Sequence, residues 1–197
     1  MKSQTTTLGV IVGNRDFFPD QLVSEARADL QALFDKYQIR PIWVAPDATK
    51  LGGVETHAEA RICAELFRRH REDIQGVLVC LPNFGDEKGV ADVLKLSRLN
   101  VPVLVQAYPD DLGQLGVERR RDGFCGKISV CNNLVQAGIK FSLTGKHVTH
   151  PSSADFKRDL ANFVGTCRVV NGLRGVRLGA VGARPGAFNT VRYSEKI

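Results

Sequence analysis

Residues 8–18 read Leu8-Gly9-Val10-Ile11-Val12-Gly13-Asn14-Arg15-Asp16-Phe17-Phe18, a short apolar run followed by a polar loop that opens with glycine. Such a run predicts a buried β-strand, and the residues after it predict the turn into a helix. Residues 178–188 partly repeat this pattern, and the sequence ends nine residues later. We therefore expect two strand-loop-helix units, one opening a first domain and one opening a second domain that is left incomplete.

Strand and helix patterns alternate between these two stretches. Strands are predicted over 8–12, 39–44, 77–81 and 101–105, and helices over 20–37, 54–70, 89–99, 129–137 and 154–170. Thr56 and Glu59 have the spacing of a capping box, and Ser152 or Ser153 is the expected N-cap of the last helix.

Short, wholly apolar strands separated by amphipathic helices indicate a parallel sheet with helices on both faces. The predicted fold class is therefore α/β, a doubly wound parallel sheet of the Rossmann or flavodoxin type. The first domain is expected over residues 1–172. Residues 173–197 are expected to supply the first strand and helix of a second, truncated α/β domain.

Length and composition are those of a globular protein that buries a core, since 43% of the 197 residues are hydrophobic. No apolar run reaches the roughly 18 residues that a membrane helix needs, and residues 1–7 contain no apolar segment of a secretion signal. We therefore expect a cytoplasmic location and no membrane partner. The five cysteines form no Cys-x-x-Cys pair, so reduced thiols are expected. Cys125 and Cys131 are predicted to act as small buried hydrophobic residues.

The net charge of +6 raises the question of nucleic-acid binding. The basic clusters are locally balanced: residues 68–71 are followed by Glu72 and Asp73, and residues 119–121 lie between Glu118 and Asp122. Aromatic residues that could stack on bases are not interleaved with them. No nucleic-acid partner is expected.

The loops after the predicted strands are where a ligand is expected, because doubly wound sheets bind ligands outside the carboxyl ends of their strands. The side chains there that suit a polyhydroxylated small molecule are Asn14, Arg15, Asp16, Asn83, Phe84, Asp86, Gln106 and Tyr108. An alternative stays open, since polar residues at strand ends often only cap the next helix.

Nucleotide and metal chemistry find little support in the sequence. The first loop is not Gly-x-Gly-x-x-Gly, and residues 123–129 only distantly resemble a phosphate-binding loop. His147 and His150 are the closest histidine pair, with no carboxylate between them, so no metal site is expected on this chain.

Five segments carry a resemblance to a known family: residues 12–19, 81–87, 106–111, 121–134 and 182–193. They resemble the N-terminal part of bacterial proteins in the L-fucose and L-arabinose isomerase family. The resemblance implies aldose–ketose isomerisation with Mn²⁺, whose protein ligands belong to later domains of the family. It also implies a homo-oligomer in which the N-terminal domain of one subunit helps to close the active site of a neighbour.

By position in these segments, Arg15 and Phe84 match places where the family has substrate contacts, and Lys127 and Asn132 are further substrate-binding candidates. The leading hypothesis is an N-terminal segment of a sugar isomerase that supplies substrate-pocket and oligomer contacts and is inactive alone. A stand-alone module that binds a small carbohydrate without catalysis is the alternative. A flavodoxin-like or receiver-like domain ranks last, because the third strand ends in Cys80-Leu81-Pro82 without a phospho-acceptor Asp.

Overall fold

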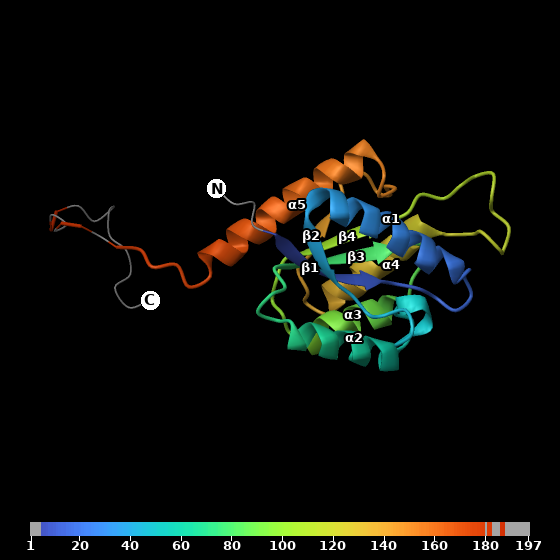
Figure 1. Ribbon diagram of the computed structural model, residues 1–197, viewed down its shortest axis with the longest axis horizontal. Coiled ribbons are helices and arrows are strands. Elements are labelled where there is room, and N and C mark those ends of the chain that lie inside the picture. The colour runs from blue at the N-terminus through green and yellow to red at the C-terminus, as the bar shows by residue number, and fades with distance from the viewer. Residues whose placement is uncertain (1–4, 180, 183–185, 188–197) are drawn as a thin grey trace.

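The computed structural model describes residues 5–179, 181–182 and 186–187. The elements, in chain order, are β1 (Thr6–Val12), α1 (Gln21–Tyr37), β2 (Ile39–Ile42), the 3₁₀ turn η1 (Lys50–Gly52), α2 (His57–Arg69), β3 (Gly76–Leu81), α3 (Glu87–Ser97), β4 (Val103–Ala107), α4 (Gly123–Gln136), β5 (Ser142–Leu143) and α5 (Ala154–Leu173) (Figure 1).

The five strands form one parallel sheet in the order β2-β1-β3-β4-β5. The chain moves from β1 to β2 on one side and returns to place β3 on the other side of β1. The strand order therefore reverses between β1 and β3, which is where sheets of this order bind ligands. The predicted α/β class with a doubly wound parallel sheet is confirmed.

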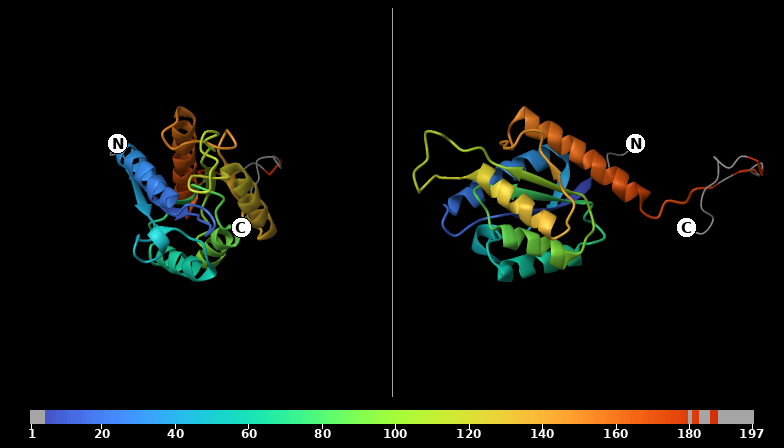
Figure 2. Two further views of the ribbon diagram at one scale, coloured as in Figure 1. Left: turned by 90° about the vertical axis from the view of Figure 1, so that its right-hand side faces the viewer. Right: turned by 180° about the vertical axis from the view of Figure 1, so that it is seen from behind.

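Helices cover both faces of the sheet (Figures 1 and 2). Val10 and Leu78 pack into a core with buried residues of α1 and α5, whereas Ile11 and Val79 pack into a core with residues of α2, α3 and α4. Neighbouring residues of one strand thus enter opposite cores, as the two-residue period of a strand requires. Burial on both faces explains why β3 and residues 8–12 of β1 contain no polar side chain.

The helix caps follow the sequence signals. Thr56 Oγ1 accepts from the backbone N–H of Glu59, and Glu59 Oε2 accepts from the backbone N–H of Thr56, which completes the predicted capping box. Ser153 Oγ caps α5 by accepting from the backbone N–H of Phe156 at 3.1 Å.

Two elements differ from the expectation. Helix α4 begins at Gly123 and not at residue 129, since Gly123 and Gly126 let its first turns lie against the backbones of Tyr108 and Phe84. Strand β5 was not expected, because its two exposed residues form no apolar run.

Residues 174–179, after α5, contain no strand, so the described residues at the start of the expected second domain, 173–197, do not form the strand that was expected to open it. The helix expected after that strand lies outside the described residues. The division of the chain at residues 172 and 173 stays a prediction.

Candidate functional site

A buried chain of side-chain hydrogen bonds joins the carboxyl ends of β1 and β3. Asn14 follows β1 and Asn83 follows β3, and neither has exposed surface. Asn83 Nδ2 donates to Asn14 Oδ1 at 2.5 Å, and Asn14 Nδ2 donates to Glu55 Oε1 at 2.6 Å and to Asp20 Oδ1 at 3.0 Å. Asn83 Oδ1 in turn accepts from the backbone N–H of Gly85. The two asparagines thus use their polar atoms within the protein and fix both loops at the point where the strand order reverses.

Lys50 completes this network from the loop after β2. Its Nζ lies 2.9 Å from Asp20 Oδ2, 3.3 Å from Asp16 Oδ1 and 3.7 Å from Glu55 Oε1. The hydrogen bond to Asp20 raises the pKa of Lys50. Burial raises the pKa of Glu55, an effect opposed by its hydrogen bond from Asn14. Neither Lys50 nor Glu55 was predicted as a site residue, because Lys50 lies in no predicted element and Glu55 lies at the start of the helix predicted over 54–70.

Arg15 and Phe84 form the solvent-facing part of the same region. The Arg15 guanidinium lies 4.7 Å from the centroid of the Phe84 ring, and its Nη2 atom is 3.2 Å from Glu87 Oε2. Phe84 stacks on Phe18 with a centroid distance of 6.1 Å. The Arg15 side chain is 37% exposed, so its donors can be reached from solvent, and Phe84 is half-buried. A cation beside an aromatic face can donate to a hydroxyl group while the ring packs against C–H groups.

The two aspartates of these loops, Asp16 and Asp86, differ in their bonding partners. Asp86 Oδ1 accepts from the backbone N–H of Gly89 at 2.6 Å and caps α3, which is the alternative role noted above for polar residues at strand ends. The Asp16 side chain is 92% exposed and pairs with Lys50.

Gln106 and Tyr108, at the end of β4, are buried and bonded within the protein. Gln106 Nε2 donates to the backbone carbonyl of Thr149 at 2.6 Å, while Gln106 Oε1 has no hydrogen-bond partner among the residues that the structure describes. The Tyr108 hydroxyl donates to Asp29 Oδ2 at 2.9 Å, and the Arg121 guanidinium lies over its ring at 4.8 Å. Burial raises the pKa of Tyr108.

Within the described residues, the two candidates on α4 are not bonded to the loops after β1 and β3, although α4 begins beside Phe84. Lys127 is buried, and its Nζ donates to Thr144 Oγ1 at 2.7 Å and to the His147 carbonyl at 2.8 Å. Burial lowers its pKa to about 8. Asn132 is exposed in the middle of α4. The structure therefore gathers Asn14, Arg15, Asp16, Asn83, Phe84 and Asp86 in the loops after β1 and β3, and not the other four.

The cysteines on α4 correct the expectation from sequence. Cys125 is exposed and Cys131 is half-buried, whereas Cys63, Cys80 and Cys167 are fully buried. Cys125 lies in the first turn of α4 on its outer side, because the two glycines of that turn occupy the inner side against the loops.

No group of three or more His, Cys, Asp and Glu side chains within the described ranges is placed to hold a metal ion. The carboxylates of Asp16, Asp20 and Glu55 lie near one another because each pairs with the ammonium group of Lys50. These residues do not fit Mn²⁺, and the expectation that the family's metal is held by other domains stays a prediction. No helix in the described part of the chain is long and apolar enough to cross a membrane.

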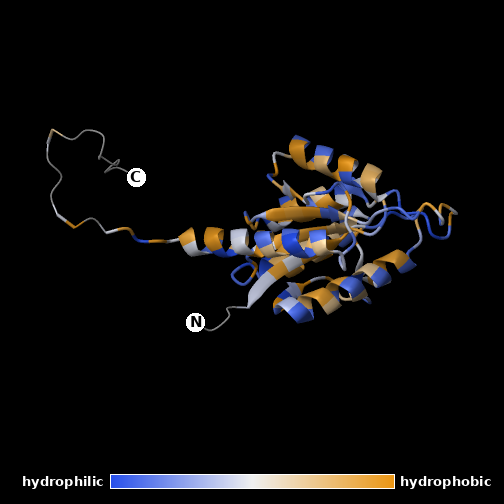
Figure 3. Cartoon of the chain, turned by 90° about the horizontal axis from the view of Figure 1, so that it is seen from above, coloured by the Kyte–Doolittle hydropathy of each residue, from blue (hydrophilic) through white to orange (hydrophobic). Residues whose placement is uncertain are grey.

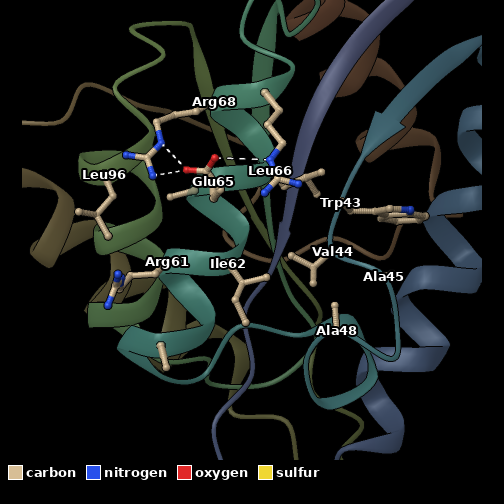
Figure 4. Close-up of a pocket in the computed structure, with 13 residues that line it drawn as sticks. Trp43, Val44, Ala45, Ala48, Arg61, Ile62, Glu65, Leu66, Arg68 and Leu96 are labelled. Carbon is tan, nitrogen blue, oxygen red and sulfur yellow. Dashed lines mark hydrogen bonds and ion pairs between the residues drawn. The ribbon is translucent and has the colours of Figure 1, made fainter.

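A groove of about 950 Å³ lies elsewhere, between the end of β2 and the outer side of α2 (Figure 4). None of the ten predicted site residues lines this groove.

The sequence matches a family model. A search of curated proteins finds no match. A family model described as the N-terminal domain of fucose/sulfoquinovose isomerase matches residues 9–174, a range that runs from β1 to the end of α5. The resemblance to fucose isomerases noted in the sequence is thereby confirmed, and the chain belongs to the fucose/sulfoquinovose isomerase family, of which it contains the N-terminal domain.

Proposed function

We propose that this domain binds part of a sugar substrate at the loops after β1 and β3 and so serves aldose–ketose isomerisation. The observation that supports the proposal best is the pair formed by Arg15 and Phe84. At the reversal of strand order Arg15 is exposed and Phe84 is half-buried, and the buried hydrogen bond between Asn14 and Asn83 holds their two loops together. Preorganised donors beside an aromatic face suit a carbohydrate.

The charges around the pair favour a neutral sugar over a sulfonated one. The cationic groups in and beside these loops are Arg15, Lys50, Lys88 and Arg121, which donates to the Pro82 carbonyl, and the carboxylates are Asp16, Asp20, Glu25, Glu55, Asp86 and Glu87. Arg15 and Lys50 are each already paired with carboxylates, so an added sulfonate would face a net negative surface. Fucose is a neutral sugar, whereas sulfoquinovose carries a sulfonate.

Saturation-transfer NMR with the purified chain tests this assignment. L-Fucose should bind saturably, and a sulfonated hexose should bind more weakly. Arg15→Ala should weaken the binding of L-fucose about 10-fold or more, since a charge-assisted hydrogen bond contributes roughly 1.5–3 kcal/mol. Arg158→Ala removes an exposed arginine that pairs with Asp155 on α5 and serves as the matched control. Absence of saturable sugar binding, or equal binding by Arg15→Ala, would contradict the proposal.

We place the metal-dependent chemistry in other domains of the isomerase. The purified chain with Mn²⁺ and aldoses should then form no ketose. Ketose formation that follows the concentration of this chain would overturn that part of the proposal and leave the sugar-binding assignment to its own test.

A further inference from the structure

The groove beside α2 has an apolar floor and a basic rim. Its floor is formed by side chains that include Trp43, Val44, Ile62 and Leu66, from the segment after β2 and from α2 (Figure 4). Ile62 is 44% exposed. Soluble proteins seldom leave a hollowed apolar surface of this kind uncovered without a binding role.

Three arginines and one glutamate border the groove: Arg61, Arg68, Arg69 and Glu65. Arg68 and Arg69 both pair with Glu65, and the shared carboxylate cannot neutralise both. Arg61 makes no ion pair with any residue that the structure describes. The rim is therefore positively charged, and an occupant with apolar and acidic side chains would complement it.

A protruding loop of the same chain has that composition. Residues 109–118, here called the arm, leave the end of β4 and extend from the body of the domain before α4 begins (Figures 1 and 2). Leu112, Leu115 and Val117 are 86%, 56% and 66% exposed. Asp110, Asp111 and Glu118 lie among them, and the loop alternates between apolar and hydrophilic segments (Figure 3).

The base of the arm is attached to its own domain. Arg119 and Arg121 pair with Glu25 at 2.7 and 3.3 Å, and Arg120 pairs with Asp122 at 2.7 Å. Two carboxylates thus offset part of the charge of the three arginines beside the arm. Among the described residues, Asp111 and Glu118 form no ion pair, so the arm presents unpaired acidic groups together with its apolar side chains.

We infer that the arm of one copy docks in the groove of a second copy. Leu112, Leu115 and Val117 cover the apolar floor, while Asp111 and Glu118 face the arginines of the rim. The contact forms between chains, because the arm leaves β4 and the groove lies beside β2, at the other side of the sheet. Two different surfaces meet, so the association is head-to-tail and leaves a free arm at one end and a free groove at the other until a ring closes.

This assembly is independent of the proposed sugar site, since no residue of the arm or the groove belongs to the loops after β1 and β3. Sedimentation velocity over a range of concentrations should show the chain associating. Leu115→Glu in the arm and Ile62→Glu in the groove should each abolish association, because each places a carboxylate in the apolar contact. Val169→Glu, at a 60% exposed position on α5, is the matched control and should associate as the wild type does.

Mixing the two variants gives the decisive measurement. Leu115→Glu retains a groove and Ile62→Glu retains an arm, so an equimolar mixture should form a heterodimer that grows no further. If circular dichroism shows that Ile62→Glu does not fold, Arg61→Glu replaces it. A double variant that carries both Arg61→Glu and Asp111→Lys should then associate again, because the two charges are exchanged across the contact. A wild-type chain that stays monomeric, single variants that associate normally, or a mixture that stays monomeric would overturn the inference.

Trp43 supplies a second measurement, because it is the single tryptophan of the chain and lines the groove. Its emission should shift to shorter wavelength as the concentration of the wild-type chain rises, and should not do so in Leu115→Glu. An equal shift in both proteins would show that association, if it occurs, buries Trp43 by another route, and would overturn the assignment of the arm.

Discussion

Asn83 donates from its side-chain amide to the side-chain carbonyl of Asn14 at 2.5 Å, and the two residues join the loops after β1 and β3 without exposing either side chain. Parallel strands bring their carboxyl ends to one edge of the sheet but do not fix the loops that follow. Here a single buried contact does so, and the Arg15–Phe84 pair lies directly outside it. The geometry of the proposed sugar site therefore depends on Asn14 and Asn83, whose polar atoms are bonded within the protein and not available to a sugar.

Asn83→Asp tests this dependence. At neutral pH the variant replaces a buried donor with a carboxylate that faces Asn14 Oδ1, and the free energy of unfolding should fall by about 2–4 kcal/mol. Protonation restores an O–H donor, so the deficit relative to wild type should shrink as the pH falls. Urea denaturation at several pH values measures this difference.

Asn132→Asp, at an exposed position on α4, is the matched control and should stay within about 0.5 kcal/mol of wild type. A deficit for Asn83→Asp that does not change with pH would mean that loss of the donor is not its cause.

Much of the fold could be predicted because its signals are local. Fully apolar strands and the Thr56–Glu59 capping box depend on neighbouring residues, and both are found in the structure. The start of α4 was missed because Gly123 and Gly126 are weak helix formers that serve a tertiary contact. Strand β5 is too short to leave a pattern.

The site could be predicted only for residues that closely follow a strand, because the carboxyl ends of parallel strands lie at one edge of the sheet. Asn14 and Asn83 directly follow strands, so the carboxyl-end rule brings them together. Lys50 and Glu55 reach the same point from a loop whose path no local pattern describes. Gln106 and Tyr108 follow the rule in sequence, whereas Lys127 is a candidate from the family resemblance; the packing of residues 144–150 and α1 covers all three. Their role in substrate binding stays a prediction.

The thiols should react with a disulfide reagent in separate phases. Cys125 is exposed and should react first, whereas burial raises the pKa of Cys131 and slows it. Cys63, with a pKa raised by burial to about 12, Cys80 and Cys167 should react only on unfolding. Cys125→Ser should remove the fast phase without a change in the melting temperature. A fast phase that persists in Cys125→Ser would contradict the exposed position of this thiol.

Lys127 should make the stability of the protein rise with pH in the alkaline range. Burial lowers its pKa from the ordinary 10.5 to about 8, so between these values the unfolded chain holds a proton that the folded chain has lost. The free energy of unfolding therefore increases across this interval, by at most ~3 kcal/mol. Below pH 8 both states are protonated and the slope from this group vanishes.

Lys127→Met separates this effect from those of other groups that titrate in the same range. The difference in unfolding free energy between wild type and variant should grow in favour of wild type from pH 8 to pH 10.5. Thermal or urea denaturation measures it, with Lys157→Met on α5 as a control of equal charge change. A difference that is constant over this interval would mean that Lys127 keeps an ordinary pKa in the folded protein.

Replacing two helix glycines by alanine should change the stability of the protein in opposite directions. A Cβ at Gly126 on α4 would overlap the carbonyl oxygen of Phe84, whereas a Cβ at Gly165 on α5 would meet no atom within 4 Å. Gly165→Ala should therefore stabilise the protein by about 0.5–1 kcal/mol, since alanine is the better helix former. Gly126→Ala should destabilise it by about 1–3 kcal/mol, because backbone on both sides must move apart. Chemical denaturation measures both variants.

Gly126→Ala should also loosen the sugar site, because the displaced residue is Phe84 and its ring lies under Arg15. The variant should lose affinity for L-fucose even under conditions in which it is fully folded, and Gly165→Ala should not. If Gly126→Ala gains stability as Gly165→Ala does, then α4 does not lie against the loop after β3 as described. If it loses stability but binds the sugar normally, Phe84 is not a contact of the substrate. The paired glycine variants thus test the packing of α4 and the proposed site separately.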